Sequence, residues 1–157
     1  MRDKDLLLGI DIGTTGTKCS VYDFRGIRVA SAYREYPMIH PRPGWTEQDP
    51  YRWWDTVCCN LQTIFKSQNI DKNRIAAVGT SSTNAVVLVD RQGQPVCNAI
   101  SLHDQRSGHQ VEWLKENIGE ERIRGVAANR IANGSFCLPA LRWLVENQVD
   151  LIKGAYK

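Results

Sequence analysis

The segment with the clearest chemical potential is residues 11–18, which read Asp-Ile-Gly-Thr-Thr-Gly-Thr-Lys. Its two glycines, Gly13 and Gly16, lack a Cβ atom, so the backbone can approach a ligand closely and adopt positive φ angles. Successive backbone N–H groups in such a turn can form a concave binding site for an anion. Two hydroxyl groups and one amine add to this chemistry, from Thr14, Thr15 and Lys18. The segment is therefore a candidate phosphate-binding turn.

A carboxylate stands at the start of this turn. Mg²⁺ usually binds proteins through one or two carboxylates together with substrate phosphates, so Asp11 could hold the hydration shell of a magnesium ion. The nucleotide-binding patterns GxxxxGK[ST] and GxGxxG are both absent, because the glycines fall at positions 9, 13 and 16. An ordinary hairpin turn is the alternative interpretation, since these residue types are common in turns.

The elements that must position this turn follow from hydrophobic patterning. Residues 6–12 are mostly apolar and are followed by Gly13, which predicts a buried strand. Residues 17–24 and 27–36 predict two more strands, joined by a short turn that contains a glycine. We expect the three strands to form an antiparallel meander, with the candidate phosphate-binding turn between the first two.

A loop and a helix follow the meander. Three prolines and a glycine in residues 37–44 exclude a helix there. Asp49 and Pro50 are typical of an N-cap and a first helical residue, so we expect a helix from Pro50 to about Ser67. Apolar side chains at helical spacing predict the face that packs on the sheet. They belong to Trp54, Val57, Cys58, Leu61, Ile64 and Phe65.

The rest of the chain mixes strands and helices. Short apolar segments predict a buried strand at residues 75–79 and two further strands at 85–89 and 96–102. Helical spacing predicts helices at 107–118 and 138–147. The resulting order, β-β-β-α-β-β-β-α, defines an α/β or α+β fold in which helices flank a mixed sheet.

Composition limits the function classes. A length of 157 residues fits one domain or one lobe of a larger protein. The net charge is only +3 and no block of basic residues occurs, which argues against a nucleic-acid partner. Apolar runs are too short for a membrane span or a signal peptide. Five cysteines without a CxxC pair indicate reduced thiols and neither a disulfide framework nor a zinc site, so we expect a cytoplasmic protein without a membrane partner.

Four segments, in this order, resemble motifs of one protein family. The pattern Asp-x-Gly-Thr-Thr at residues 11–15 resembles the first phosphate motif of the actin-like ATPase superfamily. Residues 44–54 and 98–106 are similar to Trp-x-Glu-x-Asp-Pro…Trp-Trp and Ala-Ile-x-Trp-x-Asp-x-Arg of the FGGY carbohydrate kinases. Residues 135–147 resemble a signature of that family that ends in Lys-x-x-Trp-Leu. The resemblance implies the ribonuclease H-like N-terminal lobe of an actin-like ATPase, with an incomplete mixed sheet.

The resemblance also implies the reaction. Members of this family are ATP-dependent kinases that use Mg²⁺ and phosphorylate a sugar or polyol. By this likeness Asp11 would lie beside the magnesium ion, which it would bind through water. The γ-phosphate would be surrounded by Gly13, Thr14, Thr15 and Lys18. Family members are often dimers or larger, so a homo-oligomer is one implied assembly.

One edge of the family's sugar pocket follows the strand at residues 75–82. Thr83 and Asn84 stand where xylulose kinases have Met and His and glycerol kinases have Arg and Glu. Both are neutral hydrogen-bonding groups suited to hydroxyls, although a role in turn formation is the alternative. Asp104 could contact the sugar or form a structural ion pair with Arg106.

The chain departs from the family pattern at three positions. Leu102 replaces a tryptophan, Ala140 replaces a lysine, and Ser135 replaces an aromatic residue. These differences favour a ketose or polyol other than the substrates of ordinary xylulose and glycerol kinases.

The family's catalytic Asp, second phosphate motif and adenosine pocket all come after the signature segment. We therefore expect residues 1–157 to be the N-terminal part of the first lobe, without the second lobe and inactive alone. A non-catalytic sugar- or nucleotide-binding lobe, or a remnant without turnover, is the alternative.

Overall fold

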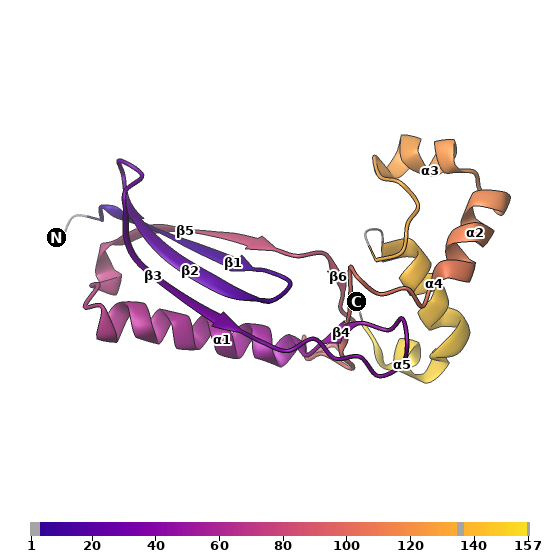
Figure 1. Ribbon diagram of the computed structural model, residues 1–157, viewed down its shortest axis with the longest axis horizontal. Helices are drawn as coiled ribbons and strands as arrows, with labels where there is room; N and C mark the ends of the chain where they lie inside the picture. Colours follow the sequence, from indigo (N-terminus) through magenta and orange to yellow (C-terminus); the bar gives the residue numbers. More distant parts are fainter. Residues whose placement is uncertain (1–3, 135–136, 157) are drawn as a thin grey trace. The chain divides into compact units, whose positions relative to one another are not determined.

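The computed structural model describes residues 4–134 and 137–156. The chain divides into two compact units (Figure 1). Unit 1 contains Met1–Pro37 and Tyr51–Thr83, and unit 2 contains Met38–Pro50 and Asn84–Lys157. The candidate phosphate-binding turn therefore belongs to unit 1, whereas the segment around Asp104 belongs to unit 2.

Unit 1 is built on a four-stranded sheet with the order β3-β2-β1-β5. The strands β1 (Leu6–Ile12), β2 (Gly16–Asp23) and β3 (Arg28–Glu35) form the predicted antiparallel meander. The strand β5 (Ile75–Ser82) pairs with β1 in parallel, so the sheet is mixed, as predicted. Parallel neighbours need a long crossover connection, and the helical segment between β3 and β5 supplies it.

Helix α1 (Pro50–Gln62) continues into a π-helical segment (Thr63–Ser67) and lies along one face of the sheet (Figure 1). Its beginning at Pro50 and its extent agree with the prediction. The predicted packing face is wrong at Trp54, which is 69% exposed. The buried side of the helical segment runs through Val57, Asn60 and Ile64. Because the polar side chain of Asn60 also packs toward the sheet, the buried side is turned relative to the purely apolar face, and Trp54 lies at its edge. The core of unit 1 comprises Leu6, Leu8, Cys19, Val21, Ala30 and Ile64.

The strand β5 differs from its prediction in length and in burial. Residues 75–79 were expected to be buried, but from Ala76 to Ser82 every residue of β5 is exposed. The reason is its place in the sheet: β5 is an edge strand. Of its side chains, Ile75 alone packs on the core cluster formed by the described residues. An apolar composition indicated a strand correctly but did not indicate whether its faces were covered.

Unit 2 contains a small antiparallel sheet with the order β4-β7-β6. Its strands are short: β4 (Glu47–Gln48), β6 (Ala85–Val86) and β7 (Ala99–Ser101). The strands expected at 85–89 and 96–102 are therefore present but shorter than predicted, and β4 was not predicted. Two or three residues carry too little alternation to be recognised from sequence.

The helices of unit 2 are α2 (Gly108–Asn117), α3 (Glu120–Ala127), α4 (Cys137–Asn147) and α5 (Val149–Gly154). Two of them, α2 and α4, confirm the predictions. The other two are too short for a clear apolar repeat. Ser135 lies outside the described residues. Across the described parts of the chain, no helix has the length and apolar character needed to cross a bilayer.

Candidate functional site

The candidate phosphate-binding turn is the hairpin that joins β1 to β2 (Figure 1). The Gly13 N–H donates a hydrogen bond of 2.9 Å to the Gly16 carbonyl, which closes the turn. The expected positive φ angles are wrong, since neither glycine is among the described residues that have one. A glycine is needed at position 16 for a steric reason instead. A Cβ atom there would lie 2.5 Å from the Arg34 carbonyl oxygen and 2.6 Å from the Tyr33 hydroxyl.

Several carbonyl groups of the turn are held by donors of the protein itself. The Gly13 carbonyl accepts a hydrogen bond from the Tyr36 hydroxyl, and the Thr15 carbonyl accepts one from the Tyr36 N–H at 3.2 Å. The Ile12 carbonyl accepts from the Thr83 N–H at 2.8 Å. A carbonyl oxygen is the negative end of the peptide dipole and would repel a phosphate. Holding these oxygens within the protein therefore favours an anion site at the turn.

A buried polar network fixes the end of the turn to helix α1. The Thr17 side chain is fully buried, and its hydroxyl oxygen lies 3.0 Å from that of Thr56. The Thr17 carbonyl accepts a hydrogen bond of 2.8 Å from the Asn60 amide, which is also fully buried. Such contacts are strong in a low-dielectric interior and specify one arrangement. The start of β2 is thereby held against α1.

Two predicted side chains are brought together on the opposite face of the sheet. Asp11 and Lys18 are directly opposite each other in the β1–β2 register, and both are exposed. They line a hollow of about 410 Å³ that also includes Ser81, the partner of Asp11 on β5. A single exposed carboxylate beside a phosphate turn fits Mg²⁺, which keeps several water ligands and takes others from phosphates. The described residues contain no cluster of three or more metal-ligating side chains.

The end of β5 approaches the same turn. The hydroxyl oxygens of Thr14 and Thr83 lie 3.2 Å apart in a half-buried contact. The structure thus places one predicted sugar-binding residue beside a predicted phosphate-binding residue within unit 1. Asn84, the other predicted sugar contact, is the first residue of the following segment of unit 2 and is exposed.

Asp104 belongs to a buried ion cluster in unit 2. Its side chain is 1% exposed and accepts hydrogen bonds from the Thr46 N–H at 2.7 Å and from Arg106 Nε and Nη2 at 2.9 and 2.8 Å. Arg106 also pairs with Glu47 at 2.8 Å, and its guanidinium carbon lies 3.9 Å from the centroid of a Trp45 ring. The ion pair expected between Asp104 and Arg106 is therefore present, whereas a sugar contact of Asp104 stays a prediction.

Several residues that shape these two regions were not predicted. Tyr36, Thr56 and Asn60 hold the turn through contacts with residues 20 or more positions away, and no local pattern marks them. A weak signal existed for the ion cluster. Glu47 and Arg106 have opposite charges and stand in two of the recognised motifs, so their pairing could have been proposed.

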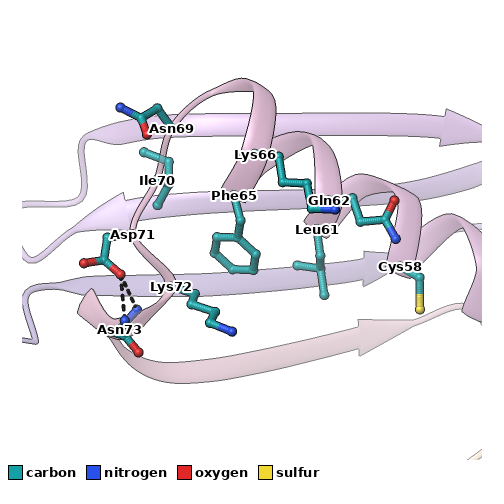
Figure 2. Close-up of a pocket in the computed structure, with 10 residues that line it drawn as sticks. All are labelled: Cys58, Leu61, Gln62, Phe65, Lys66, Asn69, Ile70, Asp71, Lys72 and Asn73. Carbon is teal, nitrogen blue, oxygen red and sulfur yellow. Dashed lines mark hydrogen bonds between the residues drawn. The ribbon is translucent and has the colours of Figure 1, made fainter.

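Another hollow of unit 1 lies away from the candidate phosphate-binding turn. A pocket of about 890 Å³ runs beside the C-terminal part of α1 and the segment after it (Figure 2). Figure 2 shows its apolar side chains, Leu61, Phe65 and Ile70, with the hydrogen-bonded pair Asp71 and Asn73 at one end. None of the predicted site residues lines this pocket.

Comparison with known proteins gives one consistent result. The N-terminal domain of the FGGY family of carbohydrate kinases matches residues 6–157. A glycerol kinase from Haloferax volcanii is 34% identical over 146 residues, covering 92% of this chain and 28% of that protein. A xylulose kinase from Staphylococcus xylosus is 32% identical over 152 residues, covering 96% of this chain and 31% of that protein.

The fold gives the same answer. A crystal structure described as a xyloylose kinase from Brucella ovis superposes with a TM-score of 0.89 at 26% identity, covering 97% of this chain and 31% of that one. The actin-like ATPase fold expected from the motifs is confirmed. The chain spans less than a third of the length of these relatives. It belongs to the FGGY family of carbohydrate kinases.

Proposed function

We propose that this chain supplies the phosphate-binding turn and one edge of the sugar pocket of an ATP-dependent carbohydrate kinase. The reaction would transfer the γ-phosphate of ATP to a hydroxyl of a ketose or polyol. One observation carries the proposal. The protein holds carbonyl groups of the turn in its own contacts, while the side chains of Asp11 and Lys18 are exposed on one face of the sheet.

The turn residues have distinct proposed roles. The Lys18 amine and the hydroxyls of Thr14 and Thr15 would donate to the γ-phosphate, and Gly13 would let the backbone approach it. Donors fixed around a transferring phosphoryl group stabilise the charge of the transition state. Asp11 would orient a hydrated magnesium ion. The bound ion would neutralise phosphate charge.

The acceptor would lie beside the end of β5. Phosphoryl transfer requires the attacking hydroxyl close to and in line with the phosphorus atom, so sugar and phosphate residues must be neighbours. The contact between Thr14 and Thr83 supports this placement. Thr83 and Asn84 would hydrogen-bond to sugar hydroxyls. Because Leu102 and Ala140 depart from the family pattern, we propose a ketose or polyol other than xylulose or glycerol.

The remaining machinery would come from outside these residues. We propose that residues 1–157 are the N-terminal part of the first lobe of the kinase, which agrees with their share of the relatives' length. The general base and the adenosine pocket would then lie further along a longer chain.

The five cysteines are free thiols, which is consistent with the reducing cytoplasm.

The test is an ADP-release assay on the longest gene product that contains this chain, with Mg·ATP and a panel of pentuloses, hexuloses and polyols. Asp11→Ala and Thr14→Ala should lower turnover far more than sugar affinity. Asn84→Ala should raise KM for the sugar and leave KM for ATP nearly unchanged. Equal losses of turnover and sugar affinity in the turn variants would contradict the assignment. Sugar binding without ADP formation would instead support a non-catalytic binding lobe.

A further inference from the structure

Tyr36 forms hydrogen bonds with the candidate phosphate-binding turn at two points. It directly follows β3 and is 7% exposed. Its hydroxyl donates to the Gly13 carbonyl, and its own N–H donates to the Thr15 carbonyl at 3.2 Å. One residue, just after the third strand, therefore fixes two of the peptide groups that form the turn between the first two strands.

The hydroxyl contact sets the direction of a peptide group. All peptide bonds of the described residues are trans, and in a trans peptide the C=O and N–H groups point in opposite directions. Because Tyr36 holds the Gly13 carbonyl, the N–H of Thr14 must point away from Tyr36. Without that contact, the Gly13–Thr14 peptide could rotate and present its carbonyl oxygen where a phosphate would bind.

The surroundings of Tyr36 keep its hydroxyl a donor. Burial raises the pKa of Tyr36 above its ordinary value, although a hydrogen bond with the Thr17 side chain partly opposes this rise. The phenol is therefore neutral at physiological pH and retains the proton that it donates to Gly13.

We infer that Tyr36 is a positioning residue whose hydroxyl orients the Gly13–Thr14 peptide and so raises the affinity of the turn for the terminal phosphate of a nucleotide. The inference rests on the proposed function. Tyr36 acts through Gly13 and Thr14 and need not touch the nucleotide.

A second tyrosine provides a matched control. Tyr33 lies on β3, three residues before Tyr36, and its hydroxyl is 3.3 Å from the Thr15 hydroxyl. That contact joins two exposed side chains and orients no peptide group, and Tyr33 itself is 49% exposed. Phenylalanine at either position removes one oxygen atom and keeps the ring.

The experiment measures the Kd of Mg·ATP by calorimetry on the longest gene product that contains this chain. Tyr36→Phe should raise Kd roughly fivefold, as expected for the loss of one hydrogen bond that orients a binding group. Tyr33→Phe should change Kd by less than about twofold, because an exposed hydrogen bond contributes little. In kinetics, Tyr36→Phe should raise KM for ATP and leave KM for the sugar nearly constant.

A destabilised core variant separates positioning from general loss of stability. Ile64→Val trims a fully buried side chain on the π-helical segment and lowers stability without removing a hydrogen bond to the turn. If Ile64→Val raised the Kd of Mg·ATP as much as Tyr36→Phe, or if Tyr36→Phe left Kd unchanged, the inference would be overturned while the proposed function stood. If the unmodified protein bound no Mg·ATP, both would fail.

Discussion

The candidate phosphate-binding turn of unit 1 and the buried ion cluster of unit 2, formed by Asp104, Arg106 and Glu47, use their charged residues in opposite ways. In the turn, the protein holds backbone carbonyls and leaves the side chains of Asp11 and Lys18 exposed. In the cluster, the side chains of Asp104 and Arg106 are 1% and 4% exposed and satisfy each other. Both segments resemble family motifs. The difference teaches that residue type alone does not indicate whether the charged groups of a motif are exposed and available to a ligand or buried in structural contacts.

The same contrast has an energetic side. Removing one partner of a buried ion pair leaves an uncompensated charge in a low-dielectric interior, which is strongly destabilising. Removing an exposed charge changes stability little, because water already solvates it. The cluster should therefore respond to substitution through stability, and the turn should respond through ligand binding and turnover.

The largest stability effect is expected for Arg106→Ala. This change leaves the Asp104 carboxylate buried without its guanidinium partner and should lower the free energy of unfolding by about 3–5 kcal/mol. Urea denaturation measures it. Arg142→Ala is the control, because Arg142 also lies over a tryptophan ring and pairs with Glu146, but its side chain is 31% exposed. If Arg142→Ala lowered the free energy of unfolding as much as Arg106→Ala, burial of the ion pair would not explain the effect.

The next largest effect is expected for Gly16→Ala. The new methyl group would collide with the Arg34 carbonyl and the Tyr33 ring, so unfolding free energy should fall by roughly 1–3 kcal/mol. Gly79→Ala is the matched control on β5, where a Cβ atom meets nothing within 4 Å. Its effect should stay within about 1 kcal/mol. Thermal melts of both variants check this, and equal losses would show that the turn is not tightly packed.

A smaller effect is expected for Thr83→Val. This nearly isosteric change removes the hydroxyl that contacts Thr14 and should lower stability by about 1 kcal/mol, the usual value of one hydrogen bond. Thr80→Val, on the exposed strand β5 that Thr83 directly follows, serves as the control and should lower stability less. Denaturation of the two variants under identical conditions decides the matter. A neutral Thr83→Val would mean that the turn does not depend on the end of β5.

The smallest effect concerns the ion pair of Asp5 and Arg74, whose side chains are both 44% exposed. Arg74 donates to both carboxylate oxygens of Asp5 and lowers the pKa of that carboxyl below its ordinary value of 3.8. Because the pKa of Asp5 is lower in the folded than in the unfolded chain, the ion pair stabilises the folded state at pH values above the unfolded pKa. This contribution disappears as the pH falls through the folded pKa. The stability difference between the unmodified chain and Asp5→Asn should therefore be present at pH 6 and shrink below pH 4. A difference that grows on acidification would contradict the assignment.

Local patterns predicted the parts of the molecule that local physics determines. The meander, the start of α1 at Pro50 and the hairpin at residues 11–18 follow from apolar spacing, a helix-starting pair and glycines. The exposure of Trp54 could not be predicted, because buried hydrogen bonds from Thr56 and Asn60 to Thr17 decide which side of α1 faces the sheet.

Long-range contacts explain the rest. Apolar composition identified β5 as a strand, but burial depends on neighbours that the strand's own sequence does not encode. Likewise, the motif alone indicates Asp11 and Lys18 as candidate ligand-binding residues. The role of Tyr36 follows only from its hydrogen bond to the Gly13 carbonyl in the folded chain. The sequence motif therefore proposes the residues that would face a ligand, which stays a prediction, and it does not mark the residues that hold the turn in place.

The most direct test of the central claim is to measure turnover and unfolding free energy together for Asp11→Asn. Asp11 is exposed, so the unfolding free energy should change by less than about 0.5 kcal/mol. If the proposed function holds, turnover with Mg·ATP and the sugar should fall by roughly a hundredfold, because the carboxylate proposed to orient the magnesium ion is lost. Unchanged turnover, or a loss explained by unfolding, would show that the turn is a structural hairpin.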